Sequence, residues 1–266
     1  MPDYLQEHYS HSDEESRLLS RHGQVEYLTT LRYVERYLFP GAKILEIGAG
    51  TGRYSHALAK QGYAVDALEP VPYHIEIFQS KITPEEKISI RQGNARDLSA
   101  FADDAYDLIL LLGPLYHLFT AEDKRQAIRE ALRVTKPGGL VFAAYCVADA
   151  SILNYGFKKG NIHRLLEPND FCGLTMPGYK PWSTPKSVIE IVRKEDIDAL
   201  MTGFPVERLH YVATDLFTEH LSETVDAMDD ATFEVYLNYH FFLCERPDML
   251  GITHHSLDIF RKEGAT

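Results

Sequence analysis

Residues 42–52 read AKILEIGAGTG, a short apolar run followed by three glycines at alternate positions. A run of this kind is typical of a buried parallel strand that leads through a tight turn into a helix. Glycine lets the backbone turn sharply and approach a ligand closely. We therefore predict a strand over 42–47, a ligand-binding turn over 48–52 and a helix from about 54 to 61.

The same alternation of elements continues along the chain. Apolar runs predict strands at 64–68, 88–91, 106–112 and 140–145, and helical periodicity predicts helices at 73–80 and 121–134. The sequence KPGG at 136–139 is expected to form the turn before the 140–145 strand, because proline ends helices and glycine adopts positive φ. Strands that alternate with helices indicate an α/β fold with a doubly wound, mostly parallel sheet.

The segments around this alternation predict one domain over residues 1–266 with three additions. Apolar residues at helical spacing between 14 and 38 predict an N-terminal helical cap over 1–40. Glycine and proline are frequent in 147–185, which predicts a loop-rich cover. A helix is expected at 194–201, a strand at 206–213, a helical insertion broken near Asp229-Asp230 at 216–245, and a closing strand at 254–261.

Composition excludes several classes of partner and site. The formal net charge of −12 over 266 residues, without a basic patch, argues against nucleic acid and against an anionic membrane surface. The three cysteines are widely spaced, and no cluster of carboxylates and histidines has metal-ligand spacing, so no disulfide framework and no metal is predicted. No signal peptide and no apolar span is found, which predicts a cytoplasmic protein. The oligomeric state is left open.

A carboxylate follows the next predicted strand. Glu69 lies nineteen positions after Gly50, at the end of the 64–68 run. Because ligands of open parallel sheets bind at the carboxyl ends of the strands, Glu69 is expected near the glycine turn. A carboxylate in that position can accept hydrogen bonds from both hydroxyls of a ribose.

The spacing resembles that of class I S-adenosylmethionine (SAM)-dependent methyltransferases, whose first motif is acidic-x-Gly-x-Gly-x-Gly. Glu46, Gly48, Gly50 and Gly52 match that motif residue for residue. A dinucleotide-binding loop would place its third glycine where this chain has Arg53, which favours SAM over a pyrophosphate cofactor. The resemblance implies a Rossmann-like fold with an antiparallel last strand. It also implies that SAM is bound by residues that include Ala49 and Pro70.

Two later segments are similar to the same family. In Gln92–Asp97 the resemblance implies that Asn94 and Ala95 bind the adenine, Asn94 standing where the family often has an acid. Residues 111–118 read LLGPLYHL, which resembles a bacterial subset of the family. There the resemblance implies that Leu112 and Gly113 face the methionine part of SAM and that Tyr116 and His117 border its methyl group. The resemblance covers about residues 20–146 firmly and the remainder loosely.

Methyl transfer from a sulfonium is an in-line displacement, so alignment and exclusion of water matter most. His117 is the leading candidate for a general base, the alternative being that it only packs or hydrogen-bonds its loop. Tyr9, Arg21 and His22 are candidates to fold over the cofactor. Arg21 suits the methionine carboxylate, although a solvated arginine on a helix face is the more ordinary interpretation.

Aromatic residues in the carboxyl-terminal part could form a wall against a flat or apolar acceptor. The alternative is that they are a packed core face of a helix. The residues concerned are Phe233, Tyr236, Tyr239, His240, Phe241 and Phe242, with Tyr179 and Trp182 in the 147–185 segment.

We therefore expect a methyltransferase acting on a small molecule, with the acceptor atom (O, N or C) left open. A catalytically silent SAM-binding sensor or scaffold is the main alternative. A short-chain dehydrogenase is less favoured, because the match of Tyr155 and Lys159 to Tyr-x-x-x-Lys falls in a glycine-containing segment with the wrong glycine loop. A nucleic-acid methyltransferase is disfavoured by the acidic charge and by Leu112-Gly113-Pro114-Leu115 where a Pro-Pro-Tyr motif would stand.

Overall fold

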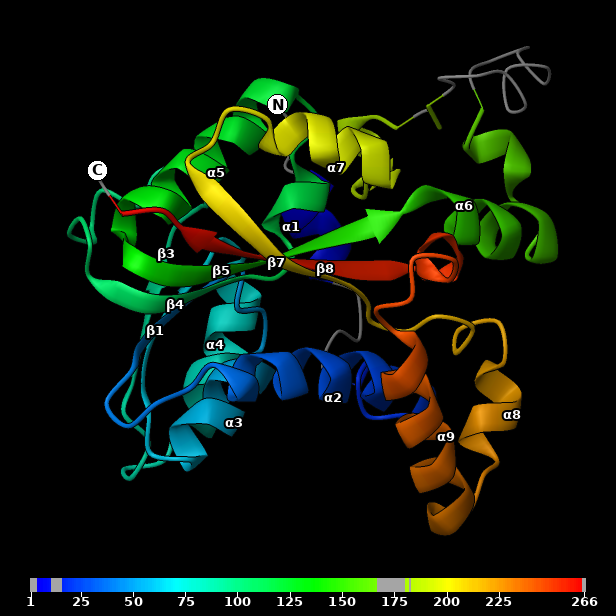
Figure 1. Ribbon diagram of the computed structural model, residues 1–266, viewed down its shortest axis with the longest axis horizontal. Coiled ribbons are helices and arrows are strands. Elements are labelled where there is room, and N and C mark those ends of the chain that lie inside the picture. Colours follow the sequence, from blue (N-terminus) through cyan, green and yellow to red (C-terminus); the bar gives the residue numbers. More distant parts are fainter. Residues whose placement is uncertain (1–3, 11–15, 167–179, 182, 265–266) are drawn as a thin grey trace.

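A computed structural model describes residues 4–10, 16–166, 180–181 and 183–264. Within these residues the chain forms one twisted sheet of eight strands, flanked by helices on both faces (Figure 1). The strand order is β3-β2-β1-β4-β5-β8-β7, and β6 pairs with β5 beside this path. The strands are β1 (Lys43–Ile47), β2 (Ala64–Glu69), β3 (Ile88–Gln92), β4 (Tyr106–Leu111), β5 (Thr135–Val147), β6 (Ile191–Val192), β7 (Val206–Ala213) and β8 (His255–Lys262).

The first five strands pair in parallel, whereas β8 runs antiparallel to both of its neighbours. On either side of β1, Ile44 pairs with Val65 of β2 and with Leu108 of β4. Both neighbours of β1 in the sheet, β2 and β4, thus follow β1 in the chain, and the order of the strands reverses at β1. This is the topological switch point, where a crevice opens at the carboxyl ends of parallel strands.

The helices divide between the two faces of the sheet (Figure 1). One face carries α2 (Arg21–Arg36) and α3 (Arg53–Lys60), and the other carries α5 (Ala121–Val134) and α7 (Lys194–Met201). Successive strand side chains point to opposite faces. Accordingly Ile44 packs with Val34 and Leu58 beneath α2 and α3, while Leu45 packs with Ala127 beneath α5.

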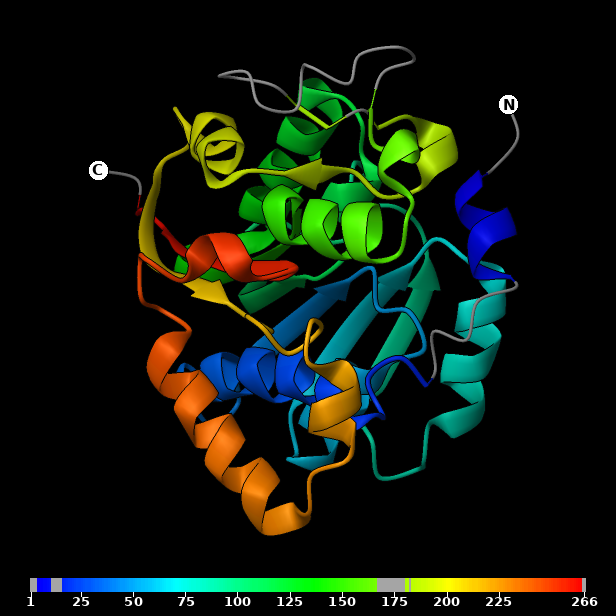
Figure 2. The same ribbon diagram turned by 90° about the vertical axis from the view of Figure 1, so that its right-hand side faces the viewer.

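Four further helices lie near the crevice and at the edge of the α2 layer. The short α1 (Tyr4–Tyr9) lies beside α4 (Pro72–Lys81), and the rings of Tyr9 and His74 are 5.1 Å apart (Figure 2). Both α8 (Ser222–Asp226) and α9 (Asp230–Leu243) contact α2. Helix α9 begins after Asp229, whose side chain caps the helix by accepting a hydrogen bond from the N–H of Thr232.

The structure differs from the sequence prediction in two segments. The first part of the expected loop-rich cover is helical, as α6 (Ala148–Ser151) continues into a π-helical segment (Ile152–Lys158); residues 167–179 and 182 lie outside the described residues. The KPGG sequence does not form a separate turn but lies inside β5, where the pairing with β4 shifts register and Gly138 has φ 77°. A register shift there absorbs the positive φ within the strand.

Candidate active site

A cavity of about 450 Å³ opens at the carboxyl ends of β1, β2 and β4. Its wall includes the glycine turn after β1, the residues after β2 and β3, the segment after β4, and part of α1. Nearly all of the predicted cofactor residues meet here: Glu46, Gly48, Ala49, Gly50, Glu69, Pro70, Asn94, Ala95, Leu112 and Gly113. We call this space the first cavity.

The three glycines of the turn have different reasons for lacking a side chain. All have positive φ, and a Cβ on Gly48 would lie 2.7 Å from Pro114 Cδ. Gly50 has open space where a Cβ would point, so the backbone there can approach a ligand. Gly52 does not line the cavity, because its missing Cβ makes room for the Phe78 ring at 2.6 Å. Gly52 therefore allows helix α4 to pack closely against the turn.

Glu69 is fixed at the carboxyl end of β2, where it is 4% exposed. One carboxylate oxygen accepts the N–H of Gly50 at 2.8 Å, and the other accepts the N–H of Val71 at 3.0 Å. The oxygen bonded to Gly50 can accept a further bond, whereas the oxygen bonded to Val71 also lies 3.4 Å from Nδ1 of His74. The carboxylate thus ties the glycine turn to β2 and remains available to hydroxyl donors in the cavity.

Glu46 lines the first cavity, and its carboxylate is held by the start of α3. It is 1% exposed and accepts hydrogen bonds from the backbone N–H and the hydroxyl of Ser55 in the first turn of α3. Burial raises the pKa of Glu46 to about 8, although both bonds from Ser55 act in the opposite sense. Glu46 lines the cavity but is held toward α3, so it positions the glycine turn through the start of that helix.

Asn94 and Ala95 lie in a tight turn after β3. The side-chain oxygen of Asn94 accepts the N–H of Arg96 at 3.0 Å. An amide oxygen has a second lone pair, so this turn does not prevent it from accepting another bond from a ligand. Ala95 is buried at the cavity wall.

The segment after β4 is a 3-10 helix, η1 (Pro114–His117), which presents Tyr116 and His117 to the first cavity. His117 Nδ1 lies 2.7 Å from the carbonyl oxygen of Val188, so Nδ1 carries the proton and donates it. The other nitrogen, Nε2, lies 3.0 Å from the hydroxyl of Tyr9 and accepts from it. Burial lowers the pKa of His117, which keeps the imidazole neutral.

The expectation for Arg21 is wrong. Ser20 caps α2, and Arg21 in its first turn points to α9, where it forms an ion pair with Asp230 at 2.6 Å and lies over the ring of Phe233. It lines neither cavity. Arg17, four residues earlier, lines both cavities, and the sequence did not distinguish it from other surface arginines.

Several other candidates also lie away from the first cavity. None of the aromatic residues of α9 lines it, and Phe233 is buried against Val25 and Val225. Tyr155 and Lys159 line neither cavity; Lys159 pairs with Glu219 at 3.5 Å, so the dehydrogenase interpretation gains no support. Tyr179 and Trp182 lie outside the described residues.

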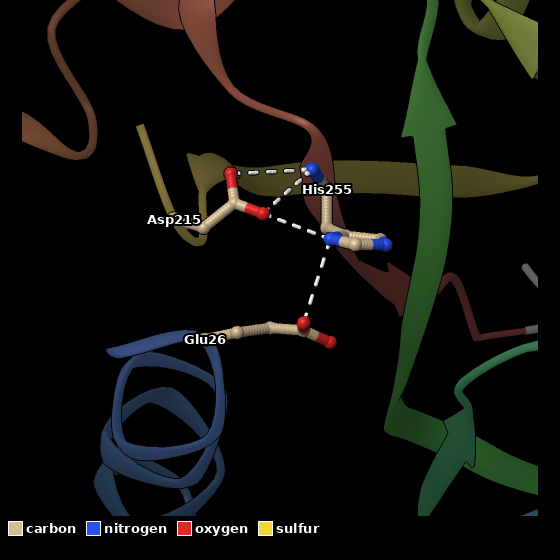
Figure 3. Close-up of side chains that lie close together, drawn as sticks. All are labelled: Glu26, Asp215 and His255. Atoms are coloured by element: carbon tan, nitrogen blue, oxygen red, sulfur yellow. Dashed lines mark hydrogen bonds and ion pairs between the residues drawn. The ribbon is translucent and has the colours of Figure 1, made fainter. Parts of the chain in front are cut away.

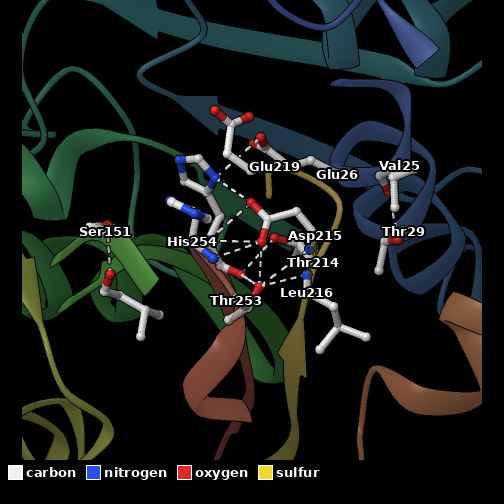
Figure 4. Close-up of polar contacts among 12 residues, drawn as sticks. Val25, Glu26, Thr29, Ser151, Thr214, Asp215, Leu216, Glu219, Thr253 and His254 are labelled. Carbon is white, nitrogen blue, oxygen red and sulfur yellow. Dashed lines mark hydrogen bonds and ion pairs between the residues drawn. The ribbon is translucent and has the colours of Figure 1, made fainter. Parts of the chain in front are cut away.

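A second cavity of about 580 Å³ adjoins the first, and Tyr9, Arg17 and Tyr116 line both. Its wall comes from α2, the segment after β7 and the start of β8. It carries three carboxylates and several imidazoles, among them Glu26, Asp215, Glu219, His254 and His255. Figure 4 shows Glu26, Glu219 and His254 around Asp215.

Glu26, Asp215 and His255 converge at this wall (Figure 3). His255 Nδ1 lies 2.8 Å from Asp215 Oδ2 and 3.4 Å from Glu26 Oε2, and one ligand atom from each residue lies within 4.8 Å of the others. Burial opposes the charge of His255, but Glu26, Cys146 and Asp215 together raise its pKa well above the usual value. His255 and Arg17 hold the pKa of Glu26 below its usual range against burial. Burial also opposes the charge of Asp215, but the hydrogen bond and charge of His255 lower the pKa of Asp215 to about 2.

The sequence does not reveal this group, because its members come from distant segments. Glu26 is on α2, Asp215 follows β7, and His255 begins β8. No local spacing links them, and only the insertion of β8 between β5 and β7 brings its first residue to α2. The adjacent histidines at 254–255 were the one visible signal.

The chain is similar to known proteins in sequence and in structure. Residues 45–143 match a family described as Methyltransferase domain. The chain is 34% identical over 128 residues to a ubiquinone biosynthesis O-methyltransferase of Methylocella silvestris, covering 48% of each chain. It is 29% identical over 118 residues to a demethylmenaquinone methyltransferase of Clavibacter sepedonicus, covering 44% of this chain and 46% of the relative. The chain thus spans about half the length of the curated relatives that it matches.

A solved structure shares the fold over nearly the whole chain. It is a SAM-dependent methyltransferase of Thermotoga maritima, described as a possible histamine N-methyltransferase, with a TM-score of 0.60, 18% identity, and coverage of 98% of this chain and 99% of that one. At this identity the likeness shows the fold alone. The predicted fold class, a mostly parallel sheet with an antiparallel last strand, is confirmed.

Proposed function

We infer that this chain, in which residues 45–143 match a methyltransferase domain and whose cofactor is SAM, transfers a methyl group to a small-molecule acceptor. The observation that carries the inference is Glu69. Its carboxylate is fixed by two backbone N–H groups at the carboxyl end of β2, directly opposite a glycine turn with open space at Gly50. A ribose diol is the ligand group that this arrangement fits.

The first cavity fits the whole of SAM by chemistry and by size. Its volume of about 450 Å³ lies in the range of small-molecule sites, roughly 300–1,000 Å³. Glu69 would hold the ribose, Asn94 and Ala95 the adenine, and Leu112 and Gly113 the methionine part. Arg17, which lines both cavities, would take the carboxylate. When bound, SAM supplies an electrophilic methyl group on a sulfonium sulfur.

The residues of the chain would align the acceptor and remove its proton. Tyr9 lines both cavities and donates its hydroxyl to His117 Nε2 at 3.0 Å. A proton from an acceptor hydroxyl or amine can pass to the Tyr9 oxygen as the Tyr9 proton moves to His117 Nε2. Tyr116 is partly buried and lines both cavities, and α1 helps to exclude water from them.

The second cavity is the proposed acceptor site, since it adjoins the first through Tyr9, Arg17 and Tyr116. Its wall of carboxylates and imidazoles suits a polar acceptor and does not suit a long apolar tail. The names of the two relatives point to hydroxylated rings of the quinone type. We therefore propose a compact, hydroxylated or amine-bearing small molecule in the cytoplasm as the acceptor. In the described part of the chain no helix has the length and apolarity to span a membrane.

Calorimetry with SAM, S-adenosylhomocysteine and NAD tests the cofactor, and turnover tests the reaction. We expect the first two ligands to bind with one site per chain and NAD not to bind. Incubation with methyl-labelled SAM and a panel of polar phenols and amines should then transfer label to an acceptor. Binding without transfer to any acceptor would favour the sensor or scaffold interpretation, and binding of NAD alone would overturn the inference.

A further inference from the structure

The wall of the second cavity holds three potential metal ligands on three separate elements. Glu26 lies in the second turn of α2, Asp215 follows β7, and His255 is the first residue of β8 (Figure 3). Ligand atoms that share an ion at 2.0–2.2 Å lie roughly 3–3.6 Å from one another. The distances of 2.8 and 3.4 Å from His255 Nδ1 to the two carboxylates are close to that spacing.

Asp215 is fixed by the polypeptide around it before any ligand arrives. Its Oδ1 accepts the N–H of His254 at 2.8 Å and the hydroxyl of Thr253 at 2.5 Å, and the N–H of His255 lies 3.3 Å away (Figure 4). These bonds leave Oδ2 directed to His255. A ligand that is oriented by hydrogen bonds in this way is typical of metal sites.

A second, independent observation points to a ligand at the same wall. His254 lines the second cavity, is 8% exposed, and its Nε2 has no hydrogen-bond partner among the described residues. A buried imidazole nitrogen without a partner is destabilising unless something occupies the space beside it. The carboxylate of Glu219 lines the cavity as well.

We propose that Glu26 Oε2, Asp215 Oδ2 and His255 Nδ1 bind one divalent transition-metal ion, with the open coordination positions facing the second cavity. Two carboxylates and an imidazole suit Mn²⁺, Fe²⁺ or Zn²⁺. The ion replaces the proton on His255 Nδ1, and this proton is released to solvent. Arg17, which bonds Glu26 Oε2 in the structure, then turns to the first cavity, whose wall it also lines. The ion would bind an oxygen of the acceptor, so this proposal rests on the assignment of the second cavity as the acceptor site.

The test is titration of Mn²⁺ into the chelator-treated full chain, followed by calorimetry and by the electron paramagnetic resonance signal of free Mn²⁺. Zn²⁺ and Mg²⁺ are titrated separately. The variants are Glu26→Gln and His255→Gln, whose side chains lie at the edge of the cavity and not in the core. The matched control is Glu245→Gln, because Glu245 also bonds a histidine, His210 Nδ1 at 2.7 Å, but lines neither cavity.

We expect one Mn²⁺ per chain, binding weakened at least about 100-fold in both cavity variants and unchanged binding in Glu245→Gln. SAM affinity, measured on the same samples, reports that each variant is folded. Absence of saturable binding of all three ions, or equal binding by the cavity variants and the parent, overturns the proposal and leaves the group as a carboxylate–imidazolium network. SAM binding without metal binding would refute only this proposal, whereas metal binding without SAM binding would refute only the proposed function.

Discussion

At the scale of single residues, Glu69 is the side chain on which the proposed cofactor site most depends. It bonds the backbone of Gly50 and Val71 and faces the first cavity. We expect Glu69→Ala to weaken SAM binding by roughly 1.5–3 kcal/mol, through loss of charge-assisted hydrogen bonds. Calorimetry measures the change, with Glu76→Ala on the exposed side of α4 as the control. An unchanged dissociation constant would remove Glu69 from the site.

Tyr9 and His117 are the residues on which the proposed proton transfer depends. If protons leave the acceptor through Tyr9 to His117, Tyr9→Phe and His117→Ala should each lower turnover by about 100-fold and leave SAM affinity nearly unchanged. Tyr4→Phe on the same helix should keep full turnover, because Tyr4 lines neither cavity. A normal rate of His117→Ala on the true acceptor would show that the pair only holds α1 in place.

At the scale of elements, the turn between β1 and α3 depends on Gly52, which does not line the first cavity. Gly52→Ala should destabilise the protein through its φ of 88° and through contact with Phe78, whereas Gly62→Ala, with φ 93° and open space, has the φ cost alone. The φ cost is about 1–2 kcal/mol, and overpacking adds about 1–3 kcal/mol. Urea unfolding of both variants checks this. Equal losses would mean that Phe78 moves aside.

The contact between α2 and α9 contains the buried imidazole of His240, which predicts that the stability of the protein depends on pH. The hydroxyl of Thr29 donates to Val25 O, so His240 Nε2 donates to Thr29 at 2.9 Å, and His240 Nδ1 has no partner among the described residues. Burial lowers the pKa of His240 to about 4, against about 6.5 in an unfolded chain. Its contribution to stability is complete above pH 6.5 and is lost as the pH falls toward 4.

The corresponding test compares His240→Gln with the parent chain. Gln can keep the donor to Thr29 but does not titrate. We expect the free energy of unfolding of the parent to fall more steeply between pH 7 and pH 5 than that of the variant, by about 1–2 kcal/mol. The measurement is urea unfolding at each pH. Parallel pH profiles would show that protonation of His240 is not coupled to unfolding.

At the scale of the whole molecule, β8 joins the two parts on which the site depends. It pairs with both β5 and β7, contributes Ile259 and Phe260 to the cores on opposite faces of the sheet, and places His255 at the second cavity. The residues proposed to bind the cofactor all precede it. Their arrangement nevertheless depends on a sheet that this strand completes.

Deletion of residues 254–266 should therefore abolish cooperative folding and SAM binding. The deletion removes Leu257, Ile259 and Phe260, each worth about 1.5–3 kcal/mol on burial, from a stability of about 5–15 kcal/mol. Near-ultraviolet circular dichroism and calorimetry measure the two losses. Deletion of residues 263–266 alone, beyond the strand, is the control. A folded, SAM-binding product of the longer deletion would show that β8 serves only the acceptor side.

The sequence by itself determined the alternating elements and most of the first cavity. The predicted helices at 121–134 and 194–201 and the strand at 206–213 have the bounds found in the structure. Glu69 and the glycine turn follow from local rules, since a strand end, a positive φ and a carboxylate nineteen residues later are all written along the chain. The resemblance of residues 111–118 to a bacterial methyltransferase subset stays a prediction.

Only the tertiary structure decided which charged residues share a cavity. Arg17 and Arg21 look alike in the sequence, but the cap at Ser20 and the position of α9 turn Arg21 away from the site. Glu26, Asp215 and His255 are separated by up to 229 positions and meet because β8 enters the sheet between β5 and β7. Spacing along the chain reports neighbours within one helix or strand, whereas a cavity wall is assembled from several elements whose packing no local pattern records.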